Sequence, residues 1–130
     1  MRSDAREAAF KIVFAKLFGG DCGEKFRTAL YKKDKLKEED CAFSERLFAL
    51  VEEHRETFLS QIGERVERFG EHRIYYADKA IMLVALAEIF YCDDVPNVVA
   101  VSEATNLARK YSAEHSAEFV NGVLGGFINE

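Results

Sequence analysis

The side chains best suited to chemistry in this sequence are cations that could bind phosphate. Arg6 lies three residues before Ala9 and four before Phe10, so it continues an apolar stripe beyond its end. We expect its side chain to project over the rim of the fold. A guanidinium there, beside Arg2, could bind a phosphate group through two parallel hydrogen bonds. The alternative is an internal ion pair with a glutamate from the acidic part of the chain.

Aromatic side chains near the C-terminus could bind unpaired bases. Tyr111 and Phe119 flank the link 112–115, and a ring at the edge of a loop can stack on a base of single-stranded RNA. Packing in the core is the alternative for both rings. His115, at the head of the last expected helix, could bond a phosphate or a base, with an exposed loop residue as the alternative.

Two features of the apolar segments imply contacts with other groups. Asn121, Gly122 and Gly125 lie away from the apolar stripe of the last helix, and a glycine inside a helix costs about 1 kcal/mol relative to alanine. They indicate a close approach by another backbone, either a neighbouring helix or a bound protein. Glu88 is the only charge between Ala80 and Cys92, and a buried carboxylate needs a donor. We expect that donor in the loop at 93–97.

The sequence contains no pattern of a catalytic or metal site. It has no nucleophile elbow, no phosphate-binding glycine loop and no metal-ligand spacing among its histidines and cysteines. We therefore expect no enzyme activity, no cofactor and no metal. Cys22, Cys41 and Cys92 are odd in number and far apart, which favours reduced thiols in the cytoplasm over a disulfide framework. We expect neither a membrane span nor a signal peptide.

Charge is distributed unevenly along the chain. The net charge of −5 argues against a nucleic-acid-binding protein. Residues 1–37, however, hold ten Lys/Arg and five Asp/Glu, whereas residues 38–130 hold eight and eighteen. The chain could thus offer a basic surface to phosphate and an acidic surface to a basic protein. The alternative is an uneven but merely solvated surface.

Apolar periodicity predicts an all-α fold. Apolar residues recur at steps of three and four, and no segment alternates over the length of a strand. The expected helices span about 4–18, 24–33, 40–69, 77–92, 97–111 and 116 onward. We expect a break in the third near 54–57, because about thirty residues are long for a globular helix. A charged connector is expected at 32–40 and a turn at 70–74.

The segment 77–92 is apolar nearly all round and is therefore expected to be the central helix, wrapped by the others. Residues 96–97, Pro-Asn, are placed to start the next helix. Ser3 or Asp4 is expected to cap the first helix, and Ser116 the last. A chain of 130 residues with six or seven helices predicts one bundle-like domain.

Three segments of the chain resemble the NusB family. The C-terminal one is the most specific, with Asp-Val-Pro at 94–96, Val-Ser-Glu-Ala at 101–104, Leu-Ala-Arg-Lys-Tyr at 107–111 and Phe-Val-Asn-Gly-Val-Leu at 119–124. The second is Ala-Arg-Glu-Ala-Ala at 5–9, and the third lies within the central segment at 80–89.

The resemblance implies a non-catalytic, RNA-binding adaptor in transcription antitermination and ribosomal RNA synthesis. It implies a NusB-like bundle of two small packed subdomains, about 1–74 and 75–130. It also implies three partners: boxA-type single-stranded RNA, the small-subunit ribosomal protein NusE, and the transcription elongation complex. We assign RNA binding to Arg2, Arg6, Tyr111, His115 and Phe119. We assign partner binding to Asp78, Asn121 and Gly122.

Two other functions stay open. A NusB-like domain also precedes the catalytic domain in a family of RNA cytosine methyltransferases; this chain ends at Glu130 without a cofactor domain, which favours the adaptor. A protein-interaction module without an RNA role is the second alternative, because the family's arginine-rich run is reduced here to Arg-Ser-Asp at 2–4. We accordingly expect weak RNA binding without NusE, and we expect Arg6→Ala to weaken it while leaving the melting temperature nearly unchanged.

Overall fold

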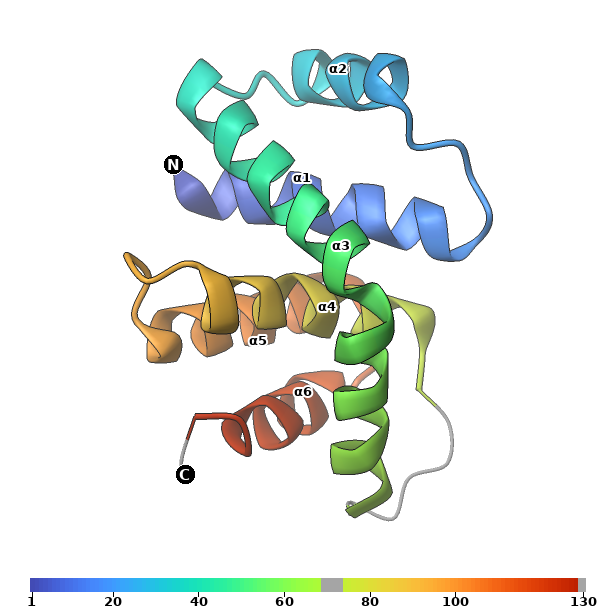
Figure 1. Cartoon of the computed structure of the whole chain (residues 1–130), viewed down its shortest axis with the longest axis vertical. Coiled ribbons are helices and arrows are strands. Elements are labelled where there is room, and N and C mark those ends of the chain that lie inside the picture. The colour runs from blue at the N-terminus through green and yellow to red at the C-terminus, as the bar shows by residue number, and fades with distance from the viewer. Residues whose placement is uncertain (69–73, 129–130) are drawn as a thin grey trace.

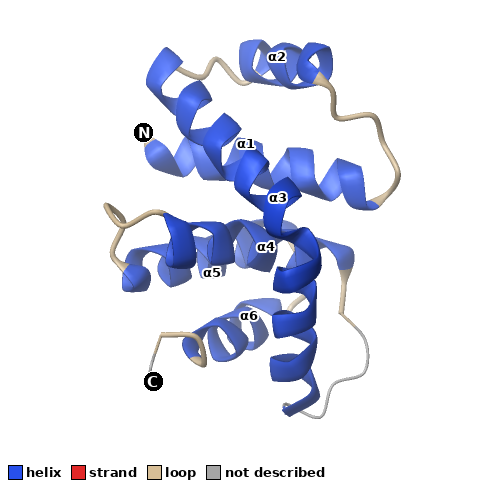
Figure 2. Ribbon diagram, in the orientation of Figure 1, coloured by secondary structure: helices blue, strands red, loops and turns tan. Residues whose placement is uncertain are grey.

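The computed structural model describes residues 1–68 and 74–128, and within these ranges the regular structure is helical throughout, with no strand (Figure 2). The prediction of an all-α bundle is confirmed. In chain order the helices are α1 (Arg2–Leu17), α2 (Glu24–Lys33), α3 (Glu38–Arg68), α4 (Tyr76–Tyr91), α5 (Asn97–Tyr111) and α6 (Ser116–Gly125).

Helix α4 is the centre of the bundle, as its all-round apolar sequence predicts. Residues 80–87 are all buried, and α4 contacts α1, α3, α5 and α6. Figure 1 shows α1 and α2 on one side of it and α6 on the other, with α5 alongside. Burial of these side chains is the main driving force for the arrangement.

Helix α3 is continuous, so the predicted break near 54–57 is wrong. It runs for 31 residues, first obliquely across α1 and then past α4 to the layer of α6 (Figure 1). Its apolar face has partners throughout: the His54 ring stacks on Tyr91 at 4.2 Å, and Phe58 is fully buried. The predicted turn at 70–74 lies outside the described residues, apart from Ile74.

The predicted helix caps are partly confirmed at α1 and wrong at α6. Met1 precedes α1, and the Asp4 carboxylate accepts a hydrogen bond from the Met1 amine at 3.3 Å. Ser3 lies inside the first turn of α1 and donates a hydrogen bond to Glu103 at 2.6 Å. Ser116 is the first residue of α6, after His115, and donates to Asp78 at 3.0 Å. Both hydroxyl groups therefore connect helices that are distant in sequence instead of closing a helix end. By contrast, α5 does begin at residues 96–97, as predicted.

The predicted stripe of α6 is confirmed in its centre. Val120, Val123 and Leu124 are fully buried, whereas Phe119 and Phe127 are only partly buried at the edge of the core. The last helix therefore presents part of two aromatic side chains to its surroundings.

Candidate functional site

A buried ion pair joins α1 to α4. The Arg6 Nε atom donates to both carboxylate oxygens of Glu88, at 2.8 and 2.9 Å. The side chains are only 6% and 1% exposed. Burial raises the pKa of the Glu88 carboxyl, and Arg6 acts in the opposite direction. A pair this deeply buried needs every polar atom satisfied, and Arg6 Nη1 is satisfied by Glu103 of α5 at 3.2 Å.

The expected positions of Arg6 and Glu88 are therefore corrected. Arg6 does not project over the rim, and the donor to Glu88 is Arg6, not the loop at 93–97. The internal ion pair that we weighed against an RNA contact is present. Two sequence features could have led to it: Arg6 continues the buried stripe of its helix, and Glu88 needs a donor.

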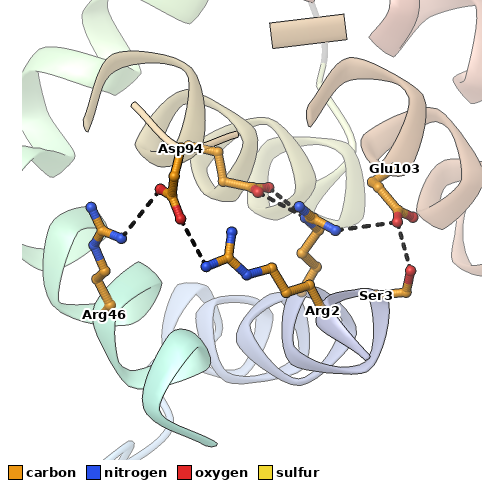
Figure 3. A network of polar contacts seen from close by, with 7 residues as sticks. Arg2, Ser3, Arg46, Asp94 and Glu103 are labelled. Carbon is orange, nitrogen blue, oxygen red and sulfur yellow. Dashed lines mark hydrogen bonds and ion pairs between the residues drawn. The ribbon is translucent and has the colours of Figure 1, made fainter. Parts of the chain in front are cut away.

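Around this pair, the first turn of α1 is bound by further acidic side chains (Figure 3). Arg2 donates to Asp94 at 2.8 Å, and Asp94 also lies 3.7 Å from Arg46 of α3. The terminal ammonium of Met1 lies 2.7 Å from Asp40. Arg2 nevertheless stays 45% exposed, so its cation is at the surface where the sequence analysis expects it.

Tyr111 lies at the surface where α5 ends beside α1. Its ring packs on Phe10 with centroids 5.0 Å apart, and its hydroxyl donates to Glu7. Lys110 binds the same carboxylate at 2.9 Å. Burial alone would raise the pKa of Glu7, but the hydrogen bonds from Tyr111 and Lys110 outweigh it and lower that pKa. The ring is thus anchored on Phe10, and the Lys110 ammonium lies over it, 5.4 Å from the ring centroid.

A surface groove of about 400 Å³ brings together three of the predicted site residues. Its lining consists of Tyr75, Asp78, Ala113, Glu114, His115, Ser116 and Phe119. His115 is exposed in this groove, and Phe119 forms an apolar part of the lining.

Asp78 is held within the chain at the base of the same groove. It is 2% exposed and accepts hydrogen bonds from Ser112 at 2.5 Å and Ser116 at 3.0 Å. The carboxylate of Asp78, predicted to bind a partner, therefore already binds the α5–α6 link within the chain. Asn121 and Gly122, also assigned to a partner, are exposed on α6 and are not among the residues that line the groove.

A row of rings along α1, from buried Phe10 through half-buried Phe14 to exposed Phe18, was not predicted from the sequence. Phe10, Phe14 and Phe18 follow one another at four-residue steps, with centroids 5.8 and 5.0 Å apart. Phe18 is 64% exposed and meets the ring of Tyr76, at the start of α4, at 4.7 Å. Exposed aromatic side chains in a continuous row are typical of a protein-binding surface. The four-residue spacing was the available signal.

The described residues contain no group of three or more side chains suited to hold a metal ion. The three cysteines are free thiols, and burial raises the pKa of each. No helix in the described ranges combines the length and the hydropathy that a membrane span requires.

Comparison with known proteins identifies relatives over the whole chain. The family model of NusB matches residues 3–129. The transcription antitermination protein NusB of Symbiobacterium thermophilum is 35% identical over 135 residues, which cover 98% of this chain and 88% of the relative.

Two solved structures share the fold. NusB of T. maritima matches with a TM-score of 0.88 at 24% identity, covering 100% of this chain and 92% of that one. A crystal structure of the antitermination factors NusB and NusE in complex with dsRNA matches with a TM-score of 0.83 at 21% identity, covering 98% and 96%.

Proposed function

The chain belongs to the NusB family, and from that premise we propose that it is an RNA-binding adaptor in transcription antitermination and ribosomal RNA synthesis. In this proposal it binds boxA-type single-stranded RNA together with the ribosomal protein NusE, in the cytoplasm, and joins the transcription elongation complex. The relatives are named for transcription antitermination and not for a reaction, which favours the adaptor over the domain of a methyltransferase.

The observation that carries the RNA part is the surface at the C-terminal end of α5. A ring anchored on one side, Tyr111, lies beside Lys110, and the groove that holds His115 and Phe119 follows the next link of the chain. Rings that stack on bases next to cations that bind phosphate are the usual elements of a surface for single-stranded RNA. Arg2 would add one exposed cation at the start of α1.

Arg6 has a different role in this proposal. Its guanidinium is occupied by Glu88 and Glu103, so it positions the first turn of α1, and with it Arg2, without touching RNA itself. This assignment replaces the direct contact expected from the sequence.

The exposed rings of Phe18 and Tyr76, together with half-buried Phe14 beside them, are proposed as the main contact with NusE. Aromatic side chains supply much of the binding energy of protein interfaces. The excess of acidic residues in 38–130 suits a basic ribosomal protein. Asn121 and Gly122 remain predictions for a further part of this contact.

The decisive experiment measures RNA binding with and without NusE. Fluorescence anisotropy of a labelled boxA-type strand, recorded over a salt series, should show weak binding to the chain alone and tight binding when NusE is added. A scrambled strand and a duplex of the same sequence are the controls for sequence and strandedness. Absence of binding to any RNA, with NusE present at low salt, would reduce the chain to a protein-interaction module.

The partner surface has a matched pair of variants. Phe18→Ser should weaken the NusE complex at least tenfold, because truncating a central aromatic anchor commonly costs about 2 kcal/mol or more. Val98→Ser, at a side chain of similar exposure on α5, should leave the complex unchanged. Calorimetric titration with NusE that gives equal dissociation constants for both variants would remove the aromatic row from the interface.

A further inference from the structure

A run of exposed cations lies where α2 ends. Lys32, Lys33, Lys35 and Lys37, here called the lysine cluster, fall within six residues, and all four are exposed. In the described part of the chain none of them forms an ion pair or a side-chain hydrogen bond. The one carboxylate among them, Asp34, is already bound by Lys11 of α1 at 2.9 Å. The cluster therefore offers four uncompensated positive charges.

The backbone that carries the cluster is ordered and bears an unusual residue. The Lys35 amide donates to the Lys32 carbonyl at 3.1 Å, and the Leu36 amide to the Tyr31 carbonyl at 3.0 Å. These two bonds form a Schellman motif, whose left-handed position normally holds glycine. Here that position holds Lys35, with a φ of 55°. A residue other than glycine is uncommon in this region, and its strain persists only where the surrounding structure holds it.

The lysine cluster is continuous with the surface around Tyr111. Glu7, which binds Tyr111 and Lys110, lies one turn before Lys11 on the same face of α1, and side chains at this spacing are about 6 Å apart. Lys11 in turn holds Asp34, whose chain neighbours are Lys33 and Lys35. A strand that leaves the ring of Tyr111 across α1 therefore reaches the cluster.

We infer that the lysine cluster binds the phosphate backbone of single-stranded RNA that extends beyond the segment held at Tyr111. The inference deepens the proposed function and rests on it. The contact is electrostatic and reads no sequence, because flexible ammonium groups bind phosphates as point charges. The acidic residues that follow, Glu38 and Glu39, lie in the first turn of α3, where the helix dipole favours them, and they pair with no lysine of the cluster.

The test compares a boxA-type RNA with the same RNA extended by roughly ten uridines at either end, a length within the usual range of single-strand sites. Dissociation constants are measured by anisotropy over a KCl series, with the full chain and saturating NusE. Of the two extended RNAs, one with uridines at its 5′ end and one with uridines at its 3′ end, the wild-type protein should bind one more tightly than the short RNA. Its binding to that RNA should also depend more steeply on salt.

Lys35→Gly should raise the stability of the protein and weaken its binding of the extended RNA. Glycine relieves the left-handed backbone, so the melting temperature should rise by roughly 2–5 °C. The slope of log affinity against log salt for the extended RNA should fall by about 0.7, the value for one phosphate contact on a single strand. Binding of the short RNA should not change. A lysine with only a structural role would alter the melting temperature and not the slope.

The triple variant Lys32→Gln, Lys33→Gln, Lys37→Gln should flatten the slope of log affinity against log salt by about 2 units. It should also weaken binding of the extended RNA at least tenfold at about 0.1 M salt. Arginine at the three positions should preserve binding. Lys25→Gln, at the other end of α2 and equally without an ion pair in the described residues, removes one charge outside the cluster and is the control for the single charge lost in Lys35→Gly.

Each other outcome overturns the inference in a recognisable way. Equal losses for short and extended RNA, or for Lys25→Gln, would indicate only a general effect of charge. Unchanged RNA binding with a weakened NusE complex would assign the cluster to a protein. If the wild-type protein with NusE binds no RNA at all, both the inference and the proposed function fail. If the wild-type protein binds RNA and the lysine variants bind it equally well, the inference fails and the proposed function remains.

Discussion

Two groups of cations lie in the first 37 residues, and they behave in opposite ways. Arg6 is buried, shares its guanidinium between two glutamates and fixes α1 to α4 and α5. The lysine cluster is exposed and pairs with no carboxylate among the described residues. In the sequence, Arg6 and each of the four lysines contribute the same single charge to the basic character of this region. The difference teaches that a count of cations in the sequence does not show which of them are paired with carboxylates in the folded protein.

The largest expected effect tests the structural group. Arg6→Ala should lower the free energy of unfolding by about 3–5 kcal/mol, because it leaves the Glu88 carboxylate buried without a partner. Urea denaturation measures the loss. The double variant Arg6→Met, Glu88→Leu should recover most of it. A fully stable Arg6→Ala protein with weakened RNA binding would return Arg6 to the RNA surface.

Tyr111, which packs on Phe10 of α1, tests the binding surface. Tyr111→Leu should weaken binding of boxA-type RNA by about 1–3 kcal/mol, the usual contribution of one stacked base. Tyr111→Phe keeps the ring and should bind as wild type, although it too loses the hydrogen bond to Glu7. Anisotropy with NusE present separates the two variants. Equal affinities for Leu and Phe would show that the ring packs only on Phe10.

A substitution with a smaller expected effect should free Arg2 from its carboxylate partner. Asp94 binds Arg2 and lies near Arg46, and Arg2 holds the pKa of that exposed carboxyl below its usual value. Asp94→Asn should therefore raise RNA affinity severalfold and steepen the salt slope by about 0.7. The melting temperature should change little, because the pair is solvent-exposed. An unchanged salt slope would mean that Arg2 does not face the RNA.

The smallest effect concerns the anchoring of α2, which carries the lysine cluster. Arg27 binds both oxygens of Glu45 at 2.8 and 3.0 Å, and this holds the pKa of Glu45 below its ordinary value of 4.5. A lowered carboxyl pKa contributes stability above pH 4.5 that is lost as the pH falls through the folded-state pKa.

Glu45→Gln should therefore melt below wild type at pH 7, and the difference should close as the pH falls below about 4.5. Thermal melts at a series of pH values provide the measurement. A gap that stays constant down to pH 3 would mean that the pair contributes through packing alone.

Local signals sufficed for most of the helices and failed for the site. A stripe such as that of α6, or the all-round apolar α4, depends on neighbours within one or two turns, and the sequence displays these directly. The pairing of Arg6 with Glu88 joins residues 82 positions apart, and only the packing of α1 on α4 brings them together. Each residue separately carried a clue, since one continued a buried stripe and the other needed a donor.

The break predicted in α3 failed for a related reason. Length alone suggested an interruption, but a helix can continue wherever its apolar face meets new partners, as it does at His54 and Phe58. Lys35 is a similar case, because its left-handed backbone conformation cannot be read from a residue type that rarely adopts it.

The continuity of α3 also has a consequence for the time at which the protein can fold during synthesis. Phe58 packs near Phe90 and Tyr91 at the end of α4, and the ring of Phe127, after α6, lies over Arg65. Phe90 follows Phe58 by roughly 30 residues, and Phe127 follows Arg65 by roughly 60, so a ribosome adding about 5–20 residues per second needs about 3–12 seconds to supply the last of these partners. During that interval the apolar face of α3 is exposed to solvent. A slow codon between α3 and α6 would lengthen the time in which this face could aggregate or bind a chaperone.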